Sequence, residues 1–309
     1  MDLSIIIVSY NTKKLLKDCL KSAFESIEKK QSSSKFQFEV FVVDNGSKDG
    51  SVEMVEKDFP QVKLIENKEN LGFAKANNQA IKKAQGRYIL LLNSDTIVLE
   101  NTLSKMINWM DSHPEVGISS CQLLNPDRSI QATGGYFPTL PRVLAWMFFL
   151  DDLPFLGKAI KPFHPHTPQF YTKDKTYTKE QELDWVTGAF FLVRREVFKK
   201  IGVLDEKFFM YVEEMEFCFR AKESGFKVVF VPESSIIHLG QRSSRVGSEG
   251  AVLGEYRGLL YFYKKHKPGW EIFPLRALLK IGAILRMVVF GLLKGRKAGA
   301  VYAKAFALA

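Results

Sequence analysis

Short apolar runs alternate with helix-patterned segments through the first 121 residues, and this alternation limits the possible folds more than any other feature. Apolar and often β-branched residues predominate at 3–8, 38–43, 62–66, 87–92 and 116–121, whereas 13–27, 73–84 and 102–111 have helical spacing. A run that is apolar at nearly every position is typical of a parallel strand buried on both faces. The sequence therefore predicts an α/β fold with a mostly parallel, doubly wound sheet.

Three of the predicted strands end on small polar side chains. These are Ser9-Tyr10-Asn11, Asp44-Asn45 and Asn93-Ser94-Asp95. Each group alone is typical of turns and helix caps. The carboxyl ends of parallel strands meet at the crevice where open α/β sheets hold ligands, so we expect the three groups together to bind a nucleotide. One Asp would contact the base or ribose, and another would hold a divalent cation against phosphate oxygens.

Several other kinds of site are disfavoured because their motifs are missing. No GxGxxG follows the first strand and no GxxxxGK[ST] occurs, so neither a dinucleotide fingerprint nor a P-loop is present. Cys19, Cys121 and Cys218 have no CxxC spacing, which argues against a zinc site or disulfide framework and for a reducing compartment. The first residues, MDLSIIIVSYN, are interpreted as a strand and not as a signal peptide.

The alternation breaks between residues 125 and 182. This segment holds seven prolines, and only 143–150 is expected to be helical. Regular structure is predicted to return at 185–193, 213–224 and 226–231. We therefore predict one domain over residues 1–263, with a nucleotide-binding half at 1–121 and a second half at 122–263, followed by a helical tail at 264–309.

Six short motifs occur in a fixed order along the chain. They are IIIVSYN, VVDNGSKDGS, ENLGFAKANNQAI, LLNSDT, DWVTGAFFLVRR and FFMYVEEMEFCFR. In this order the sequence resembles a bacterial family 2 glycosyltransferase of the GT-A fold, and in particular the rhamnosyltransferase-like branch. The resemblance covers roughly residues 3–265. It implies a Rossmann-like GT-A catalytic domain whose second half, 122–263, binds the acceptor.

The resemblance also implies roles at the donor side of the site. Ser9, Tyr10 and Asp44 would contact the nucleoside, and Lys75 and Asn77 would lie near the ribose and diphosphate. Asn11, Asn45, Asn93 and Ser94 belong to the same predicted donor crevice. Asp95 would be the metal-binding end of the family's DxD motif, although Asn93 stands where many members carry the first Asp. Mg²⁺ or Mn²⁺ would be the cofactor, because phosphate and water can supply most of its oxygen ligands.

The segment IIHLGQRSS, residues 236–244, resembles the family's loop that closes on the diphosphate. His238 would complete the metal shell, and Arg242 and Ser243 would approach the phosphate oxygens. The alternative is a purely structural histidine, which a lone His often is. His164 and His166 lie in a proline-rich segment and have no partner that the sequence identifies.

On the acceptor side, Glu214 stands where the family pattern places an Asp general base. The longer Glu side chain would set the acceptor hydroxyl slightly farther back. Glu213 would lie beside the acceptor, although Glu213 and Glu216 could instead interact with the helix dipole, with Glu216 pairing with Arg220 at i+4. Trp185, Gly188 and Ala189 resemble the acceptor-side wall, and a core strand with a tight bend is the alternative for the last two.

The resemblance therefore implies an inverting, metal-dependent transfer of a sugar from a nucleoside-diphosphate sugar to a glycan or glycolipid hydroxyl in cell-surface polysaccharide synthesis. The expected donor is dTDP-L-rhamnose, with a UDP-hexose as the alternative. A catalytically inactive, membrane-associated scaffold of the same fold is a further alternative. A sugar nucleotidyltransferase would need a glycine-rich basic loop after the first strand, and VSYNT is not one.

The tail carries nearly all of the net charge. Residues 264–309 hold ten Lys or Arg against one acid, so this segment contributes +9 of the chain's +10. At 100° per residue, Arg276, Lys280, Arg286, Lys294 and Lys297 share one helical arc of about 120°, and apolar residues cover the rest. Since Lys280 and Arg286 interrupt the apolar run, we expect the helix over 273–293 to lie in a membrane interface without crossing the membrane.

Two alternatives for the tail are packing on the protein's own body and binding to nucleic acid. The wide apolar face argues against nucleic acid as a partner. We expect the tail to hold the protein at an anionic membrane, on the cytoplasmic face of the cell membrane.

Overall fold

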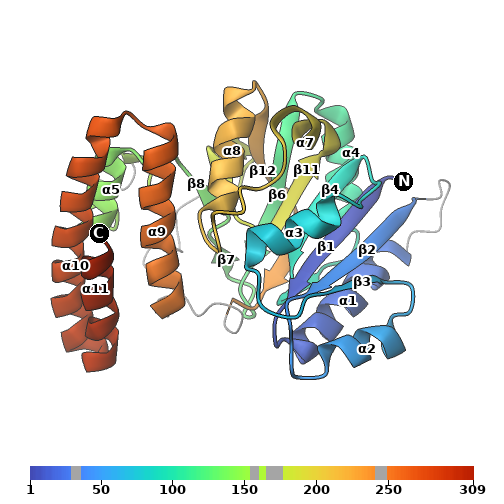
Figure 1. The fold of residues 1–309 in the computed structure, drawn as a ribbon. Coiled ribbons are helices and arrows are strands. Elements are labelled where there is room, and N and C mark those ends of the chain that lie inside the picture. Colours follow the sequence, from blue (N-terminus) through green and yellow to red (C-terminus); the bar gives the residue numbers. More distant parts are fainter. Residues whose placement is uncertain (29–35, 154–159, 165–176, 241–248) are drawn as a thin grey trace.

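A mixed β-sheet runs through the centre of the protein, with helices on both faces and a further layer of helices at one end (Figure 1). The computed structural model describes residues 1–28, 36–153, 160–164, 177–240 and 249–309. Within these residues the strands of the main sheet follow the order β3-β2-β1-β4-β11-β6-β12-β5. The predicted α/β class with a mostly parallel sheet is confirmed.

Along the main path of this sheet, four of the seven neighbouring pairs of strands are parallel. The strands of the main path are β1 (Leu3–Ser9), β2 (Phe38–Asp44), β3 (Lys63–Glu66), β4 (Tyr88–Asn93), β5 (Thr96–Val98), β6 (Val116–Leu124), β11 (Phe190–Arg194) and β12 (Lys227–His238). β1 pairs in parallel with β2 and β4, and β12 pairs in parallel with β6. β11 lies between β4 and β6 and is antiparallel to both.

The parallel strands are apolar on both faces because both faces are covered. Ile6 packs in the core cluster on one side of the sheet, whereas Ile5 and Ile7 pack in the cluster on the other side. The helices that cover the sheet are α1 (Lys13–Glu28), α2 (Ser51–Asp58), α3 (Phe73–Ile81), α4 (Thr102–Ser112), α7 (Arg195–Ile201) and α8 (Glu213–Glu223). α2 and α7 were not predicted, because 8 and 7 residues are too few for a helical period to stand out.

The segment expected to be irregular contains short elements. These are β7 (Ile130–Gln131), β8 (Gly134–Gly135), α5 (Leu140–Met147) and β9 (Gln181–Glu182). α5 begins earlier than predicted because Pro141 occupies its first turn, where a proline is well tolerated. The predicted strand at 185–193 is divided into β10 (Trp185–Val186), which pairs with β8, and β11 in the main sheet. The bend between them contains Gly188.

The C-terminal part forms the helical layer at the end of the molecule. It consists of α9 (Glu249–His266), the 3₁₀ turn η1 (Gly269–Glu271), α10 (Ile272–Lys294) and α11 (Arg296–Leu308). These helices and α5 lie side by side (Figure 1). The boundary placed between residues 263 and 264 falls inside α9, and strands from both predicted halves share the main sheet. In the described part of the chain, none of the helices combines the length and the apolar character that a membrane span requires.

The arrangement of cations predicted for α10 needs one correction. Arg276, Lys280 and Lys294 are exposed, but Arg286 at the edge of the arc is buried. Its guanidinium donates hydrogen bonds to the carbonyl oxygens of Met147 (2.5 Å) and Trp146 (2.6 Å) at the end of α5. A cation at a helix C-terminus satisfies carbonyls that lack intrahelical partners, and this explains why the charge points inward.

Candidate active site

The register of three parallel strands brings the predicted donor-side residues to one edge of the sheet. Ser9 pairs with Asp44, and Val8 pairs with Asn93. The three polar strand ends are therefore neighbours, as the sequence predicted.

Two of the serines at this edge connect strand ends. Ser9 Oγ is 2.9 Å from Thr12 Oγ1, which is 3.1 Å from Ser94 Oγ, and all three side chains are buried. This chain of hydroxyls fixes the end of β1 against the turn after β4. Ser9 and Ser94 therefore shape the crevice through the backbone that they hold.

The two carboxylate oxygens of Asp44 have different surroundings. Its Oδ1 accepts hydrogen bonds from the amides of Gly46 (3.0 Å) and Ser47 (2.8 Å), which close the turn after β2. Its Oδ2 is buried and has no hydrogen-bond partner among the described residues. Since buried acceptors are nearly always satisfied, this oxygen is suited to an N–H group of a ligand.

Tyr10 and Asn11 form the rim of the crevice. Tyr10 is 48% exposed. Asn11 has a left-handed backbone (φ 54°), and its Oδ1 accepts a 2.8 Å hydrogen bond from the amide of Lys48. Asn11 therefore joins the loop after β1 to the loop after β2 and leaves the tyrosine ring at the surface.

The amides predicted for the donor site are largely engaged with the protein itself. Asn45 donates to Gly72 O (3.2 Å) and accepts a hydrogen bond from Asn67 Nδ2 (3.0 Å), within a buried amide cluster. Asn77 is buried on α3 and donates to Phe73 O at 2.9 Å. Lys75 on the same helix is exposed. The two asparagines therefore hold the loop before α3, and the lysine alone presents its side chain to solvent.

The candidate metal site lies where β5 pairs with the end of β12. Their pairing brings His238 opposite Thr96, and His238 Nε2 lies 3.4 Å from Asp95 Oδ1. His238 Nδ1 is 2.7 Å from Gln131 Oε1, and the amide nitrogen of Gln131 donates elsewhere, to Asn125 Oδ1. The Gln131 oxygen is thus an acceptor for a proton on Nδ1, and Nε2 is the ring nitrogen that faces Asp95.

These residues fit a divalent cation that is shared with a phosphate ligand. A buried carboxylate and an imidazole nitrogen face each other, and the hydrogen bond between Gln131 and the other ring nitrogen fixes the orientation of the imidazole. Among the described residues, no group of three or more His, Cys, Asp or Glu could hold a metal by themselves. Mg²⁺ and related ions are often held by only one or two protein ligands, with water and phosphate completing the shell.

The acidic pair at the start of α8 has unusual titration behaviour. Burial, reinforced by the charge of Glu214, raises the pKa of Glu213 well above its ordinary value. Burial also raises the pKa of Glu214, and the charge of Glu255 raises it further. A hydrogen bond from the Gly188 amide and the nearby His164 lower this pKa, but burial outweighs them. A carboxylate with a raised pKa is a stronger general base than an ordinary glutamate.

The turn before α8 is strained. Tyr211 and Val212 both have left-handed backbones, with φ 73° and 74°. This conformation is a clear outlier for a β-branched residue such as Val212. Residues in such sparsely populated regions cost about 1–3 kcal/mol each and cluster at functional sites. Here the strain lies directly before Glu213 and Glu214.

Aromatic and charged groups from three parts of the chain meet on the predicted acceptor side. The ring of Trp185 lies 5.6 Å from that of His164, which lies 5.4 Å from Trp146. His164 Nε2 contacts the carboxylate of Glu255 on α9. Ala189 is buried, and its carbonyl oxygen accepts a hydrogen bond from the amide of Asn93. Ala189 therefore belongs to the core strand, which was the alternative to a role in the acceptor-side wall. Gly188 is the residue of this wall whose backbone reaches Glu214.

The sequence did not identify Gln131, Glu255 or the pairing of His164. Each acts through a partner far away in the chain, and no local pattern signals such pairs. The predicted i,i+4 pair of Glu216 with Arg220 is confirmed, with 2.9 Å and 3.0 Å hydrogen bonds from Arg220 Nε. Arg242 and Ser243, as well as His166, lie outside the described residues.

Comparison with known proteins decides the family. Residues 4–202, more than half of the chain, match the family described as Glycosyl transferase family 2. The chain belongs to glycosyltransferase family 2. The match ends before α8, so Glu214 and all of the C-terminal helices lie outside it.

Two relatives of this glycosyltransferase are rhamnosyltransferases. The N-acetylglucosaminyl-diphospho-decaprenol L-rhamnosyltransferase of Mycobacterium tuberculosis is 24% identical over 260 residues, which cover 80% of this chain and 81% of the relative. Rhamnosyltransferase WbbL of Escherichia coli is 24% identical over 181 residues, which cover 56% of this chain and 63% of WbbL. The predicted resemblance to the rhamnosyltransferase-like branch is confirmed.

Solved structures share the GT-A fold. The mannosyltransferase PcManGT from Pyrobaculum calidifontis, in complex with GDP-Man and Mn²⁺, has a TM-score of 0.56 at 15% identity, over 98% of this chain and 85% of that one. GalNAc-T7 with UDP, GalNAc and Mn²⁺ has a TM-score of 0.58 at 19% identity, over 85% of this chain and 50% of that one. At these low sequence identities, the similarity shows a shared fold and nothing more specific.

The raised pKa of Glu213 predicts a pH-dependent effect of Glu213→Gln on stability. A carboxyl group with a raised folded-state pKa stabilises the protein below its unfolded-state pKa, and this contribution is lost as the pH rises through the folded-state value. Each unit of the shift costs about 1.4 kcal/mol once it is fully expressed. The neutral glutamine avoids this cost, so the free energy of unfolding of the variant relative to wild type should increase with pH.

Urea unfolding of both proteins at several pH values between weak acid and weak base measures this difference. Glu223→Gln, at an exposed position on the same helix, is the matched control. A difference between Glu213→Gln and wild type that does not change with pH would contradict the assignment.

Proposed function

We propose that this glycosyltransferase transfers a sugar with inversion from a nucleoside-diphosphate sugar to a hydroxyl group of a glycan or glycolipid, with Glu214 as the general base. The observation that carries the proposal is the half-buried Glu214 carboxylate, which has a raised pKa and lies at the acceptor wall beside Gly188 and His164. The acceptor oxygen attacks the anomeric carbon from the face opposite the nucleotide. The bond to the diphosphate breaks, its electron pair leaves with the nucleotide, and the acceptor proton moves to Glu214.

Asp95 and His238 are the residues that we assign to a divalent cation, Mg²⁺ or Mn²⁺. When bound, the cation supplies Lewis-acid stabilisation for the charge on the departing diphosphate. Gln131 keeps the His238 ring in the tautomer that a metal ligand needs. Both structural neighbours contain Mn²⁺ together with a nucleotide or nucleotide sugar, which supports this part of the proposal by analogy.

We assign dTDP-L-rhamnose as the donor, with a UDP-hexose as the alternative. The names of two relatives, both rhamnosyltransferases, support rhamnose. The unpaired Oδ2 of Asp44 suits the imide N–H that thymine and uracil share, so it supports a pyrimidine nucleotide without distinguishing the two. The mycobacterial relative is named for N-acetylglucosaminyl-diphospho-decaprenol, which is a sugar on a lipid carrier. By analogy, we assign a lipid-linked glycan as the acceptor.

The base assignment predicts that Glu214→Gln lowers kcat by about 10²–10⁴-fold, which is the usual contribution of a general base. Glutamine has nearly the same shape but cannot accept the proton, so donor affinity should be retained. Sugar transfer to the acceptor measures kcat, and calorimetry measures donor binding. Glu223→Gln is again the control. Transfer at the wild-type rate by Glu214→Gln would remove the base assignment, and a wild-type protein inactive with every donor would favour the scaffold alternative.

The donor and metal assignments predict a specific pattern of thermal stabilisation. A ligand that binds the folded state raises the melting temperature by mass action, so dTDP with Mn²⁺ should stabilise the protein more than either alone. Asp95→Asn should lose the extra effect of Mn²⁺ and keep the effect of the nucleotide alone. Screening dTDP-, UDP- and GDP-sugars by thermal shift tests the base and sugar. Stabilisation by UDP-sugars alone would overturn dTDP-L-rhamnose, and an Mn²⁺ effect that survives in Asp95→Asn would overturn the metal site.

We further propose that α10 attaches the enzyme to an anionic membrane from the cytoplasmic side. The apolar side chains of Ile281, Ile284, Val288 and Leu292 follow helical spacing and are exposed, Leu292 to 83%. Arg276, Lys280 and Lys294 are exposed on the adjacent strip of the same helix. Another face of α10, which includes Leu275 and Leu279, is buried in the core with α5 and α9. An apolar stripe flanked by cations is typical of a helix lying in a lipid headgroup region.

This proposal predicts that the double variant Leu292→Glu/Lys294→Glu binds anionic vesicles at least about fivefold more weakly, because each basic residue near such a surface contributes about 1 kcal/mol. Co-sedimentation with phosphatidylcholine vesicles, with and without phosphatidylglycerol, measures the binding. Lys21→Glu, at an exposed position on α1, controls for the reversal of a lysine charge away from α10. Equal binding of wild-type protein to neutral and anionic vesicles, or equal binding by wild type and the double variant, would contradict it.

A further inference from the structure

The turn that presents Glu214 is held between two helices by glycines. On one side, a Cβ atom at Gly72, just before α3, would lie 2.4 Å from Phe209 O, and the amide of Phe73 donates a 2.7 Å hydrogen bond to the same oxygen. On the other side the turn lies against α9. Two helices therefore approach the segment 208–212 more closely than any side chain would permit.

The contact with α9 depends on Gly254 and Gly258, which lie one helical turn apart and are called here the glycine notch. A Cβ at Gly254 would lie 2.7 Å from Tyr211 Cδ2. A Cβ at Gly258 would lie 2.6 Å from Val212 Cγ2 and 2.8 Å from Val212 Cβ. The notch thus receives the two residues whose left-handed conformation precedes Glu213, and the backbone of such residues needs support from its surroundings.

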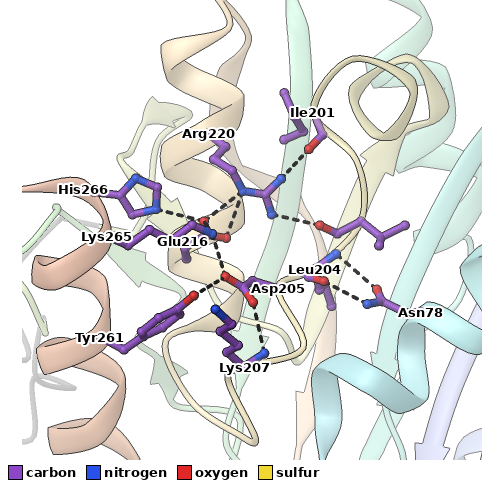
Figure 2. A network of polar contacts seen from close by, with 11 residues as sticks. Asn78, Ile201, Leu204, Asp205, Lys207, Glu216, Arg220, Tyr261, Lys265 and His266 are labelled. Carbon is purple, nitrogen blue, oxygen red and sulfur yellow. Dashed lines mark hydrogen bonds and ion pairs between the residues drawn. The ribbon is translucent and has the colours of Figure 1, made fainter.

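The C-terminal end of α9 holds α8 through a buried carboxylate (Figure 2). Glu216 accepts hydrogen bonds from Arg220 Nε, from Lys265 Nζ at 2.8 Å and from His266 Nε2 at 2.9 Å. Burial alone would raise the pKa of Glu216, but the hydrogen bonds and charge of Arg220, together with Lys265 and His266, outweigh it and lower the pKa. Glu216 is therefore an anion, held by cations of two helices.

The same network reaches the loop between α7 and α8. Asp205 accepts hydrogen bonds from Tyr261 (2.9 Å) and Lys265 (2.6 Å), both on α9. Arg220 donates to Ile201 O (2.6 Å) and Val203 O (2.9 Å), and Figure 2 shows the Ile201 contact made by the same guanidinium that binds Glu216. The loop is thus attached at its start to α9 and α8, and its end lies in the glycine notch.

We propose that α9 positions Glu214 for proton abstraction, through the glycine notch that receives Tyr211 and Val212 and through the hydrogen bonds that join Lys265 and His266 to Glu216. The proposal rests on the proposed role of Glu214 as general base. Gly254, Gly258, Glu216 and Lys265 are positioning residues, because they act on the base through the turn and through α8. Glu255, which lies between the two glycines in sequence, contacts His164 and so extends the role of α9 to the acceptor wall.

Gly258→Ala tests the notch. Alanine favours a helix more than glycine, so the substitution does not weaken α9 itself. The added methyl group must displace Val212, and displacement of a catalytic group by about 1 Å can cost 10²-fold in rate. We expect kcat to fall by about 10–10²-fold, with the KM and the calorimetric affinity for the donor unchanged.

Two further variants make the result specific. Gly250→Ala on the same helix, where a Cβ would meet no described atom within 4 Å, should stay within about twofold of wild type. Val212→Gly removes the atoms that the new methyl group would strike, so the double variant Gly258→Ala/Val212→Gly should recover most of the kcat lost by Gly258→Ala. Such a recovery would locate the effect at this contact.

Lys265→Met tests the contacts at the other end of α9. It replaces Gly258→Ala as the test of the proposal if Gly258→Ala does not fold. Methionine keeps the apolar stem but cannot bind Glu216 or Asp205, so kcat should fall several-fold, again without a change in donor affinity.

A wild-type kcat in Gly258→Ala, or in Lys265→Met where that variant replaces it, would overturn the proposal. A parallel loss of donor affinity would also overturn it, because it would indicate a general structural role. Glu214→Gln, measured alongside, separates the two ideas: if it is inactive while Gly258→Ala is normal, the positioning role alone fails.

Discussion

The parallel pairing of β1 with both β2 and β4 is the constraint on which the donor side of the site depends. In this register, Ser9 stands beside Asp44 and Val8 beside Asn93, so three turns from distant parts of the chain leave the sheet at one edge. A shift by one residue would turn every side chain to the opposite face. The buried apolar residues on both faces prevent such a shift, and the position of the polar crevice is therefore a consequence of the core.

The acidic residues of α8 show how surroundings assign different roles to the same side chain. Glu216 is surrounded by Arg220, Lys265 and His266, and its pKa is lowered. Glu213 and Glu214 are one turn or less away, burial raises their pKa values, and one oxygen of each lacks a hydrogen-bond partner in the described part of the chain. Groups whose surroundings move their pKa values apart are typical of acid–base sites. Within one turn of helix, therefore, Glu216 is held as a structural anion, whereas Glu213 and Glu214 keep an oxygen that a substrate could contact.

The sequence was informative wherever a feature is local. The strand ends, the helix at 273–293 and the Glu216–Arg220 pair were predictable because each depends on neighbours within a few residues. The partners of Glu216 on α9 are 49 and 50 residues away in sequence, and Gln131 is 107 residues from His238. No periodicity identifies such pairs. Asn45 and Asn77 illustrate a second limit, because an amide suited to a ligand is equally suited to a backbone carbonyl, and only the fold decides between the two.

The C-terminal helices cannot be regarded as an anchor that is independent of catalysis. Arg286 of α10 binds the end of α5, and α5 also supplies Trp146, whose ring lies beside His164. Lys265 and His266, near the end of α9, bind the helix that carries Glu214. Removal of the residues after 263 would therefore leave Glu216 buried without the charge of Lys265 and the hydrogen bond from His266, and an uncompensated buried charge is strongly destabilising. For this reason the proposed lipid-facing stripe and the proposed support of Glu214 must be tested by single substitutions on different faces of these helices, because truncation would remove both together.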